Sequence, residues 1–263
     1  MPGYLTKQES IAVAGVDNLI IRSLLDRQQY ADPLGEADRL GISSAAWPMF
    51  GLLWPSGAHL AARLARRPVL AAERILEIGC GLGLASLVGH RRGADVTASD
   101  CHPLAGAFLL ENLRLNGLLP MKYRHGQWGV AAVAPVVPLL AAVAPDGAPL
   151  VLPALPVELE VQGEFDLIIG SDLLYERDAD ATLAAYIALH AAPAAEVWIV
   201  DPDRGNRPAF NRGMAEQGFA HREEPLVAPP SGGTGAGAMA AYKGRLLVYR
   251  RTAVLTRGGG GPI

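Results

Sequence analysis

Short apolar runs rich in β-branched residues alternate with stripes of helical periodicity along most of the 263-residue chain. This alternation is typical of an α/β fold, a mostly parallel sheet whose faces are covered by helices. Three of the expected strands end in continuous apolar residues, as strands buried on both faces do. The pattern predicts strands at residues 74–78, 95–99, 165–170 and 196–200, and helices at 103–117, 178–190 and 208–217.

The C-terminal part of the chain predicts a second kind of strand pairing. Two extended runs, at 218–227 and 241–252, are joined by the glycine-rich segment 231–238. We expect them to form an antiparallel pair at the edge of the sheet. The last residues, 257–263, are expected to form a disordered tail.

An N-terminal extension, residues 1–51, precedes this core. It contains a strand-like run at 10–25 and a polar turn at 32–41. A short helix follows and ends before Pro68. Ser56 is expected to cap this helix, because its side-chain oxygen can accept a free backbone N–H.

The remaining residues, 52–256, fit one main domain with an Ala/Pro-rich insertion at 129–163. About twenty residues from 126 to 145 carry no charge, which is roughly the length of a membrane-spanning helix. Prolines at positions 135, 138 and 145 would break such a helix, and hydrocarbon offers no water to satisfy the freed backbone groups. We therefore expect no membrane association.

Charge and cysteine content narrow the class of protein further. Lys and Arg number 23 against 26 Asp and Glu, so the formal net charge of −3 does not indicate a nucleic-acid partner, although a local basic patch stays open. Cys80 and Cys101 cannot build a disulfide framework, and the N-terminus lacks the features of a secretory signal. Cys101 and His102 have no further Cys or His at ligand spacing, so no metal site is expected. We expect a cytoplasmic protein with reduced thiols.

The segment RILEIGCGLGLASLVGH carries the most informative chemistry. A strand runs into a turn with Gly79, Gly81 and Gly83 and then into a helix, which lets a ligand approach free backbone N–H groups closely. Leu84 stands where a dinucleotide-binding Gly-x-Gly-x-x-Gly loop requires glycine. Glu77 precedes the loop by two residues, and its carboxylate suits a ligand with an ammonium group better than one with a pyrophosphate.

A second acid, Asp100, ends the next strand, 17 residues after Gly83. A carboxylate at this strand tip can accept hydrogen bonds from ribose hydroxyls. Glu77, the three glycines and Asp100 therefore describe a nucleoside that carries an amino acid. This combination indicates S-adenosylmethionine as the cofactor.

With these residues in place, the sequence resembles class I methyltransferases, and more narrowly the group of nicotinamide N-methylase-like proteins and protein-lysine methyltransferases. The resemblance implies a seven-stranded Rossmann-like sheet with the cofactor at the C-terminal strand ends. It also implies adenine packing near Trp128, and an Asp-x-x-Tyr element, formed here by Asp172 and Tyr175, at the active-site mouth. The motifs that carry it follow in order along residues 52–178: LLWPSG, LEIGCGLG, ASDCHP, ENLRLNG, GQWG and FDLIIGSDLLYERD.

The position of Asp172 and Tyr175 also makes sense from the pattern alone. They follow the strand predicted at 165–170, so they lie at its carboxyl end, where open α/β sheets bind ligands. The loop reads SDLLY and not the Asn/Asp-Pro-Pro-Tyr/Phe of methyltransferases that act on planar amines or amides. Nucleobase and glutamine acceptors are therefore disfavoured.

Several residues keep two interpretations. Trp54 either packs in the core or lines the cofactor or acceptor site, whereas Trp47, Phe50 and Trp198 are expected in the core. The run DPDRGNR, at 201–207, is either a helix-start turn with solvated charges or a route to the acceptor through Asp201, Asp203 or Arg204.

The sequence thus predicts an S-adenosylmethionine-dependent N-methyltransferase that acts on a protein lysine amine, with the N-terminal extension and the insertion forming the acceptor wall. A small-molecule amine acceptor and a non-catalytic S-adenosylmethionine-binding module stay open as alternatives. A nicotinamide-dependent oxidoreductase is disfavoured by Leu84. The expected site has Asp172 and Tyr175 at the acceptor, no metal ligand and, for the cofactor, Trp54, Glu77, Gly79, Gly81, Gly83, Asp100, Cys101, Trp128 and Ser171.

Overall fold

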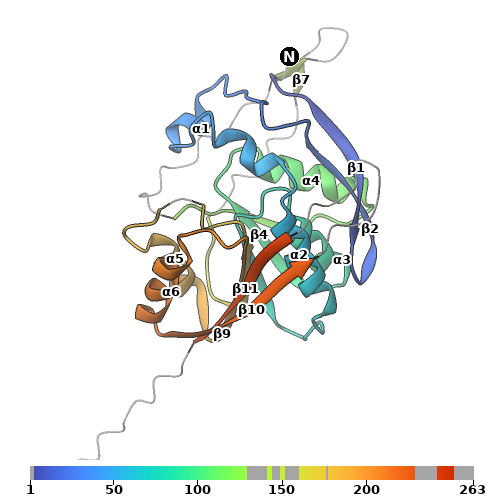
Figure 1. Ribbon diagram of the computed structural model, residues 1–263. Coiled ribbons are helices and arrows are strands. Elements are labelled where there is room, and N and C mark those ends of the chain that lie inside the picture. Colours follow the sequence, from blue (N-terminus) through green and yellow to red (C-terminus); the bar gives the residue numbers. More distant parts are fainter. Residues whose placement is uncertain are drawn as a thin grey trace, which may run out of the picture.

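The computed structural model describes residues 3–128, 141–143, 149–151, 160–175, 177–228 and 242–251 (Figure 1). Most of the insertion expected at 129–163 lies outside these residues. The same is true of the glycine-rich segment 231–238 and of the tail 257–263, whose expected disorder is a prediction about residues outside the described part.

The core of the molecule is a seven-stranded sheet with the strand order β10-β11-β9-β8-β3-β4-β5. Five neighbouring strands run parallel, while β11 is antiparallel to β9 on one side and to β10 on the other. The predicted fold class is therefore confirmed. The strands are β3 (Arg74–Ile78), β4 (Asp95–Asp100), β5 (Lys122–His125), β8 (Phe165–Ser171), β9 (Ala191–Asp201), β10 (Phe219–Ala228) and β11 (Tyr242–Arg251).

Helices cover both faces of the sheet. Successive residues of a strand point to opposite sides, so each buried strand contributes to two apolar layers. In β9, Trp198 and Val200 belong to one buried apolar cluster, whereas Val197 and Ile199 belong to the other. The helices follow the same division, and Figure 1 shows them on either side of the sheet. The first cluster includes α2 (Pro55–Arg66), α3 (Leu84–Arg91) and α4 (Ala105–Leu115), and the second includes α5 (Thr182–His190) and α6 (Arg207–Glu216).

The helix starts differ from the sequence prediction: α4 begins at Ala105 and not at Pro103, and α6 begins one residue early, at Arg207. Helix α5 begins at Thr182 and not at Asp178, because the Asp178 carboxylate stays ahead of the helix and accepts the backbone N–H groups of Thr182 and Leu183, both at 2.9 Å. The expected cap of α2 was wrong: Pro55 is the first helical residue, and no side chain caps the helix. The Ser56 hydroxyl lies instead 2.9 Å from the Tyr242 hydroxyl of β11.

The strand-like run at 10–25 was too simple a prediction. It belongs to an antiparallel hairpin of β1 (Thr6–Val13) and β2 (Val16–Leu24), with Gly15 at φ 97° in the turn between them. The expected polar turn contains the short helix α1 (Glu36–Arg39), and a 3₁₀ helix, η1 (Trp47–Gly51), follows. The three aromatic residues expected in the core are buried: Trp47, Phe50 and Trp198.

Two asparagines of the ENLRLNG motif attach this hairpin to the core. On α4, the buried Asn112 accepts the Arg22 backbone N–H at 2.8 Å and donates to the Leu82 carbonyl at 3.3 Å. One turn later, Asn116 accepts the Ile20 backbone N–H at 2.9 Å. The motif thus joins β2, α4 and the glycine loop.

Within the insertion, β6 (Ala141–Val143) and β7 (Pro149–Val151) pair antiparallel. Across the described residues, the helices are all too short or too polar to cross a bilayer.

Candidate active site

A cleft of about 460 Å³ opens at the carboxyl ends of β3, β4 and β8. The N-terminal extension supplies part of its wall through residues that include Leu40, Ile42 and Met49. The structure brings every residue of the predicted site to this cleft: Trp54, Glu77, Gly79, Gly81, Gly83, Asp100, Cys101, Trp128, Ser171, Asp172 and Tyr175.

The glycine loop after β3 needs glycine for both conformation and space. Gly79, Gly81 and Gly83 have φ values of 57°, 51° and 72°, in the left-handed region that favours glycine. A Cβ on Gly81 would lie 2.8 Å from the Phe50 carbonyl oxygen, which is backbone and cannot move aside easily. Gly83 then caps α3, so the free N–H groups of that helix begin at the cleft.

Glu77 is anchored at the start of α3. Its Oε2 accepts the backbone N–H of Ser86 at 2.7 Å and the Ser86 hydroxyl at 2.5 Å, and the side chain is 4% exposed. Burial raises the pKa of Glu77 to about 7, with the Ser86 hydrogen bonds opposing the shift and the Asp100 charge adding to it. A cation in the cleft would therefore stabilise the ionised form of Glu77.

Asp100 connects two loops beneath the cleft. Its Oδ2 accepts the Gly81 N–H and its Oδ1 accepts the His102 N–H, both at 2.8 Å. Burial raises the pKa of Asp100, and these backbone hydrogen bonds oppose the rise. Each carboxylate oxygen retains a further lone pair, so Asp100 can hold the glycine loop and accept hydrogen bonds from a ligand together.

Three contacts fasten the N-terminal extension to two residues that line the cleft, Trp54 and Gln127. The Trp54 indole donates to the Met49 carbonyl at 3.0 Å, and the Arg27 guanidinium lies 5.1 Å from the centre of the Trp54 ring. The Gln127 amide donates to the Leu40 carbonyl at 3.3 Å. Trp54 therefore lines the cleft with a fixed ring, and its role toward the cofactor or acceptor stays a prediction.

Asp172 and Tyr175 lie at the mouth, directly after β8. Asp172 has φ 57°, and its backbone N–H donates to the Val200 carbonyl of β9 at 3.0 Å. Burial raises the pKa of its carboxyl, while the Ser56 hydroxyl and the Arg204 guanidinium oppose the rise. Tyr175 is 54% exposed at the rim, so its ring is accessible from outside the cleft.

Of the three residues of the run at 201–207 that the sequence left open, Arg204 is the one at the cleft. It lines the cleft, and its Nη2 lies 3.2 Å from Asp172 Oδ1. Asp201 is fully buried and accepts the Arg204 backbone N–H at 3.0 Å, whereas Asp203 pairs with Arg207 outside the cleft. The signal was the charged run at the end of a predicted strand, but the pattern could not distinguish its members.

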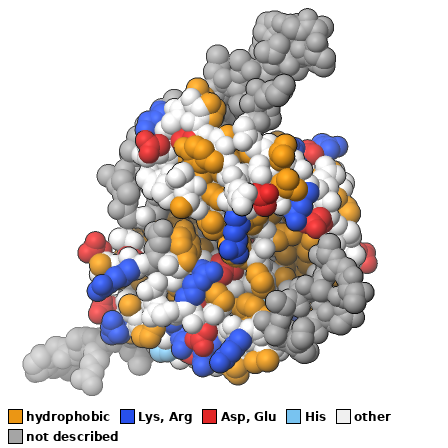
Figure 2. Space-filling model, turned by 45° about the horizontal axis from the view of Figure 1, so that its top comes forward, with side chains coloured by type: hydrophobic (Ala, Val, Ile, Leu, Met, Phe, Trp, Pro, Cys, Tyr) orange, Lys and Arg blue, Asp and Glu red, His pale blue; other side chains and the backbone are white. Residues whose placement is uncertain are grey.

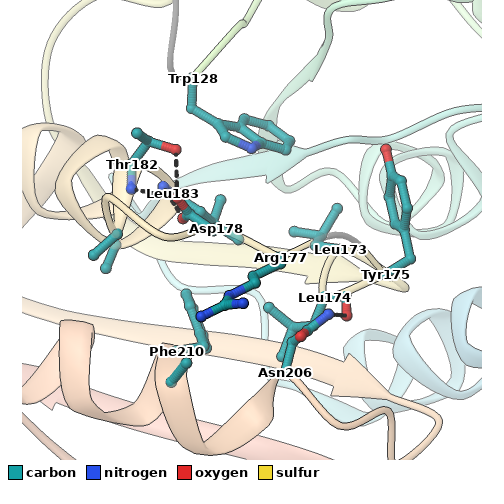
Figure 3. Close-up of a pocket in the computed structure, with 13 residues that line it drawn as sticks. Trp128, Leu173, Leu174, Tyr175, Arg177, Asp178, Thr182, Leu183, Asn206 and Phe210 are labelled. Atoms are coloured by element: carbon teal, nitrogen blue, oxygen red, sulfur yellow. Dashed lines mark hydrogen bonds between the residues drawn. The ribbon is translucent and has the colours of Figure 1, made fainter. Parts of the chain in front are cut away.

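A smaller pocket of about 200 Å³ adjoins the cleft and shares Trp128, Leu173 and Tyr175 with it. Figure 3 shows Trp128 and Tyr175 above this pocket, and Asn206, the residue before α6, and Phe210 of α6 below it. The Asn206 amide donates to the Leu174 carbonyl at 3.0 Å. The loop that carries Asp172 and Tyr175 is thereby tied to α6.

Comparison with known proteins adds relatives of one kind. No protein-family model matches the chain. The electron transfer flavoprotein beta subunit lysine methyltransferase of Rattus norvegicus is 27% identical over 167 residues, which cover 62% of this chain and 53% of the relative. The Danio rerio protein of the same name is 36% identical over 76 residues, covering 28% of this chain and 30% of the relative. The chain thus spans about half the length, or less, of these curated relatives.

Among solved structures, a T. thermophilus 16S rRNA N2 methyltransferase in complex with AdoMet and guanosine superimposes with a TM-score of 0.52. The sequence identity is 17%, and the match covers 94% of this chain and 51% of that chain. The fold is that of a class I methyltransferase. The methyltransferase fold inferred from the motifs is therefore confirmed, and the sequence relatives fall in the lysine methyltransferase group. In this methyltransferase fold, the cleft at β3, β4 and β8 lies where the resemblance implies the cofactor.

Proposed function

We propose that this chain is an S-adenosylmethionine-dependent N-methyltransferase whose acceptor is a lysine amine of a protein. The observation that carries the proposal is that residues from separate strand ends border the same cleft. Glu77, Asp100 and the Asp172–Tyr175 element come from three different strand ends, and all border one cleft. The curated relatives methylate a lysine according to their names, which supports the choice of acceptor.

The residues of the cleft fit S-adenosylmethionine. The glycine loop brings backbone without side chains to the cleft, so the amino-acid end of the ligand can approach the start of α3. Glu77 offers an anion for the ligand ammonium group, and Asp100 offers acceptors for ribose hydroxyls. Trp128 supplies an aromatic face for adenine.

Methyl transfer from a sulfonium requires the protein mainly to orient the two reactants. S-adenosylmethionine supplies a methyl group on a sulfonium; the acceptor nitrogen forms the new N–C bond as the S–C bond breaks, and the amine proton passes to water. Correct positioning of two reactants can lower a barrier by about 7 to 11 kcal/mol. Asp172 and Tyr175, at the mouth, would orient the amine along the S–CH₃ bond.

A protein acceptor is favoured over a nucleic acid. On the face drawn in Figure 2, acidic and basic side chains are interspersed, and neither sign forms one continuous patch. A nucleic-acid partner usually requires a basic surface that follows the phosphate backbone. The T. thermophilus neighbour acts on rRNA, but at 17% identity its likeness concerns the fold.

Two measurements test the proposal. Calorimetry should show binding of S-adenosylmethionine and none of NAD; failure to bind S-adenosylmethionine would end it. Tritiated methyl transfer to a lysate, separated into proteins and metabolites, should label the protein fraction. Recombinant electron transfer flavoprotein beta subunit is the first purified acceptor to assay. Label in metabolites alone would indicate a small-molecule amine, and binding without transfer to either fraction would indicate a non-catalytic module.

A further inference from the structure

A fixed cation stands beside Asp172 at the mouth of the cleft. Arg204, in the loop between β9 and α6, approaches Asp172 Oδ1 at 3.2 Å and the Asp172 carbonyl oxygen at 3.5 Å. Its own backbone N–H donates to Asp201 Oδ2 at 3.0 Å, and Asp201 is fully buried at the end of β9. Both the backbone and the guanidinium of Arg204 are therefore held in place.

Asp172 is constrained in the same way. A non-glycine residue at φ 57° is unfavourable unless neighbouring structure holds it, and here the Val200 carbonyl and Arg204 do so. The Asp172 side chain is 10% exposed against 33% for Arg204, and Asp172 Oδ2 is buried. An acceptor that enters the cleft thus meets a carboxylate that is already paired with a cation.

This pairing matters because methyl transfer needs a neutral amine. A lysine amine has an ordinary pKa of about 10.4, so it is almost fully protonated near pH 7. An unpaired carboxylate would stabilise the ammonium form and raise that pKa further. A neighbouring cation has the opposite effect and is a known way to activate an amine nucleophile.

We propose that Arg204 is a positioning and specificity-determining residue that fixes Asp172 and keeps the acceptor amine deprotonated. The inference rests on the proposed N-methyltransferase function. Arg204 is the single Lys or Arg among the described residues that line the cleft. A permanently charged guanidinium therefore faces the acceptor, and acceptors with a second positive charge beside the amine are disfavoured.

The other groups near Asp172 do not replace this cation. Asp201, from β9, is an acid whose Oδ2 accepts the Arg204 backbone N–H, so it supplies no positive charge. Tyr242, from β11, has its pKa raised to about 12 by burial and stays neutral. From β3 and β4, Glu77 and Asp100 add negative charge to the cleft, which favours protonated amines.

The test is a pH profile of methyl transfer with three variants. Initial rates of tritiated methyl transfer to the protein fraction of a lysate are measured from pH 6 to 10. With Arg204→Gln, the acid limb should shift upward by about one pH unit, whereas Arg204→Lys should restore most of the wild-type position. Arg212→Gln, an exposed arginine of α6 away from the cleft, is the matched control and should leave the profile unchanged.

Two further measurements separate the possible failures. Calorimetry should give S-adenosylmethionine affinities within about twofold for all variants, which shows that each is folded. A double-mutant cycle of Arg204→Gln and Asp172→Asn, read by urea denaturation, should reveal several-fold coupling in the unfolding constant. Additive effects would overturn the pairing. An active wild type whose acid limb does not move in Arg204→Gln would overturn the inference alone, and an inactive wild type would overturn the proposed function and the role of Arg204 with it.

Discussion

The buried carboxyl of Glu77 gives a sharp prediction for the pH dependence of stability. Its pKa rises from an ordinary 4.5 to about 7 on folding, chiefly because burial penalises the charged form. The folded protein therefore holds a proton that the unfolded chain has already released at intermediate pH. The stabilising contribution of Glu77 protonation to the free energy of unfolding is fully present below about pH 4.5 and is lost as the pH rises to about 7.

The size of this loss follows from the shift. A pKa difference between 4.5 and about 7 corresponds to about 3 kcal/mol of unfolding free energy, reached slightly above pH 7. Glu77→Gln keeps the side-chain shape and an oxygen for the Ser86 N–H but cannot ionise. The variant should therefore gain stability relative to the wild type as the pH rises from 5 to 8.

Urea denaturation of both proteins at half-unit pH intervals measures the effect. The difference between them isolates Glu77, because Asp100, Asp172 and Asp201 are also buried acids with raised pKa values and titrate in both proteins. If the two unfolding free energies run parallel from pH 5 to 8, Glu77 carries no burial penalty, and the reasoning is refuted.

Three further predictions concern the loop, the mouth and the hairpin. Gly81→Ala should lower the free energy of unfolding by about 1 to 3 kcal/mol, measured by denaturation, because its Cβ meets the Phe50 carbonyl. It should also weaken S-adenosylmethionine binding, measured by calorimetry. The control is Gly93→Ala: Gly93 also has a left-handed φ but faces open space, so this substitution should lower stability without changing binding. Asp172→Asn should reduce turnover at least tenfold while the dissociation constant of S-adenosylmethionine changes less than threefold; a loss of affinity alone would contradict the acceptor role. Asn112→Ala should destabilise the protein by about 1 to 3 kcal/mol, since it leaves the partly buried Arg22 backbone N–H unpaired, and a thermal shift below about 2 °C would contradict this.

How far the sequence could predict the fold depended on the pattern of each element. The four strands at the centre were recognisable because they carry apolar runs or alternate in a way that few helices do. The edge strand β5 reads KYRH, has no apolar run and pairs with one neighbour in the sheet, so it left no signal. The hairpin at 10–25 was read as one extended run because only two residues, Ala14 and Gly15, provide the reversal.

The candidate site was predictable where chemistry depends on position in a strand. Glu77 and Asp100 have their places fixed by strand ends, which sequence locates well. Arg204 and Ser56 were harder, because each is defined by its partner: Arg204 by Asp172, 32 positions earlier, and Ser56 by Tyr242, 186 positions later. Pairings at such separations are products of the tertiary fold and not of local pattern.

Asn112 of α4 and Asn116, directly after this helix, bind β2 through backbone atoms, and this has a consequence for how the hairpin can diverge. Amide groups that recognise backbone N–H and C=O atoms are indifferent to the side chains between them. Substitutions at the exposed positions of β2, such as Asp17 and Asn18, therefore leave these hydrogen bonds intact, whereas Leu19, Ile21 and Leu24 are fixed by burial in the core. The outer face of the hairpin is thus free to change in sequence while Asn112, which also binds the Leu82 carbonyl, keeps the glycine loop in place.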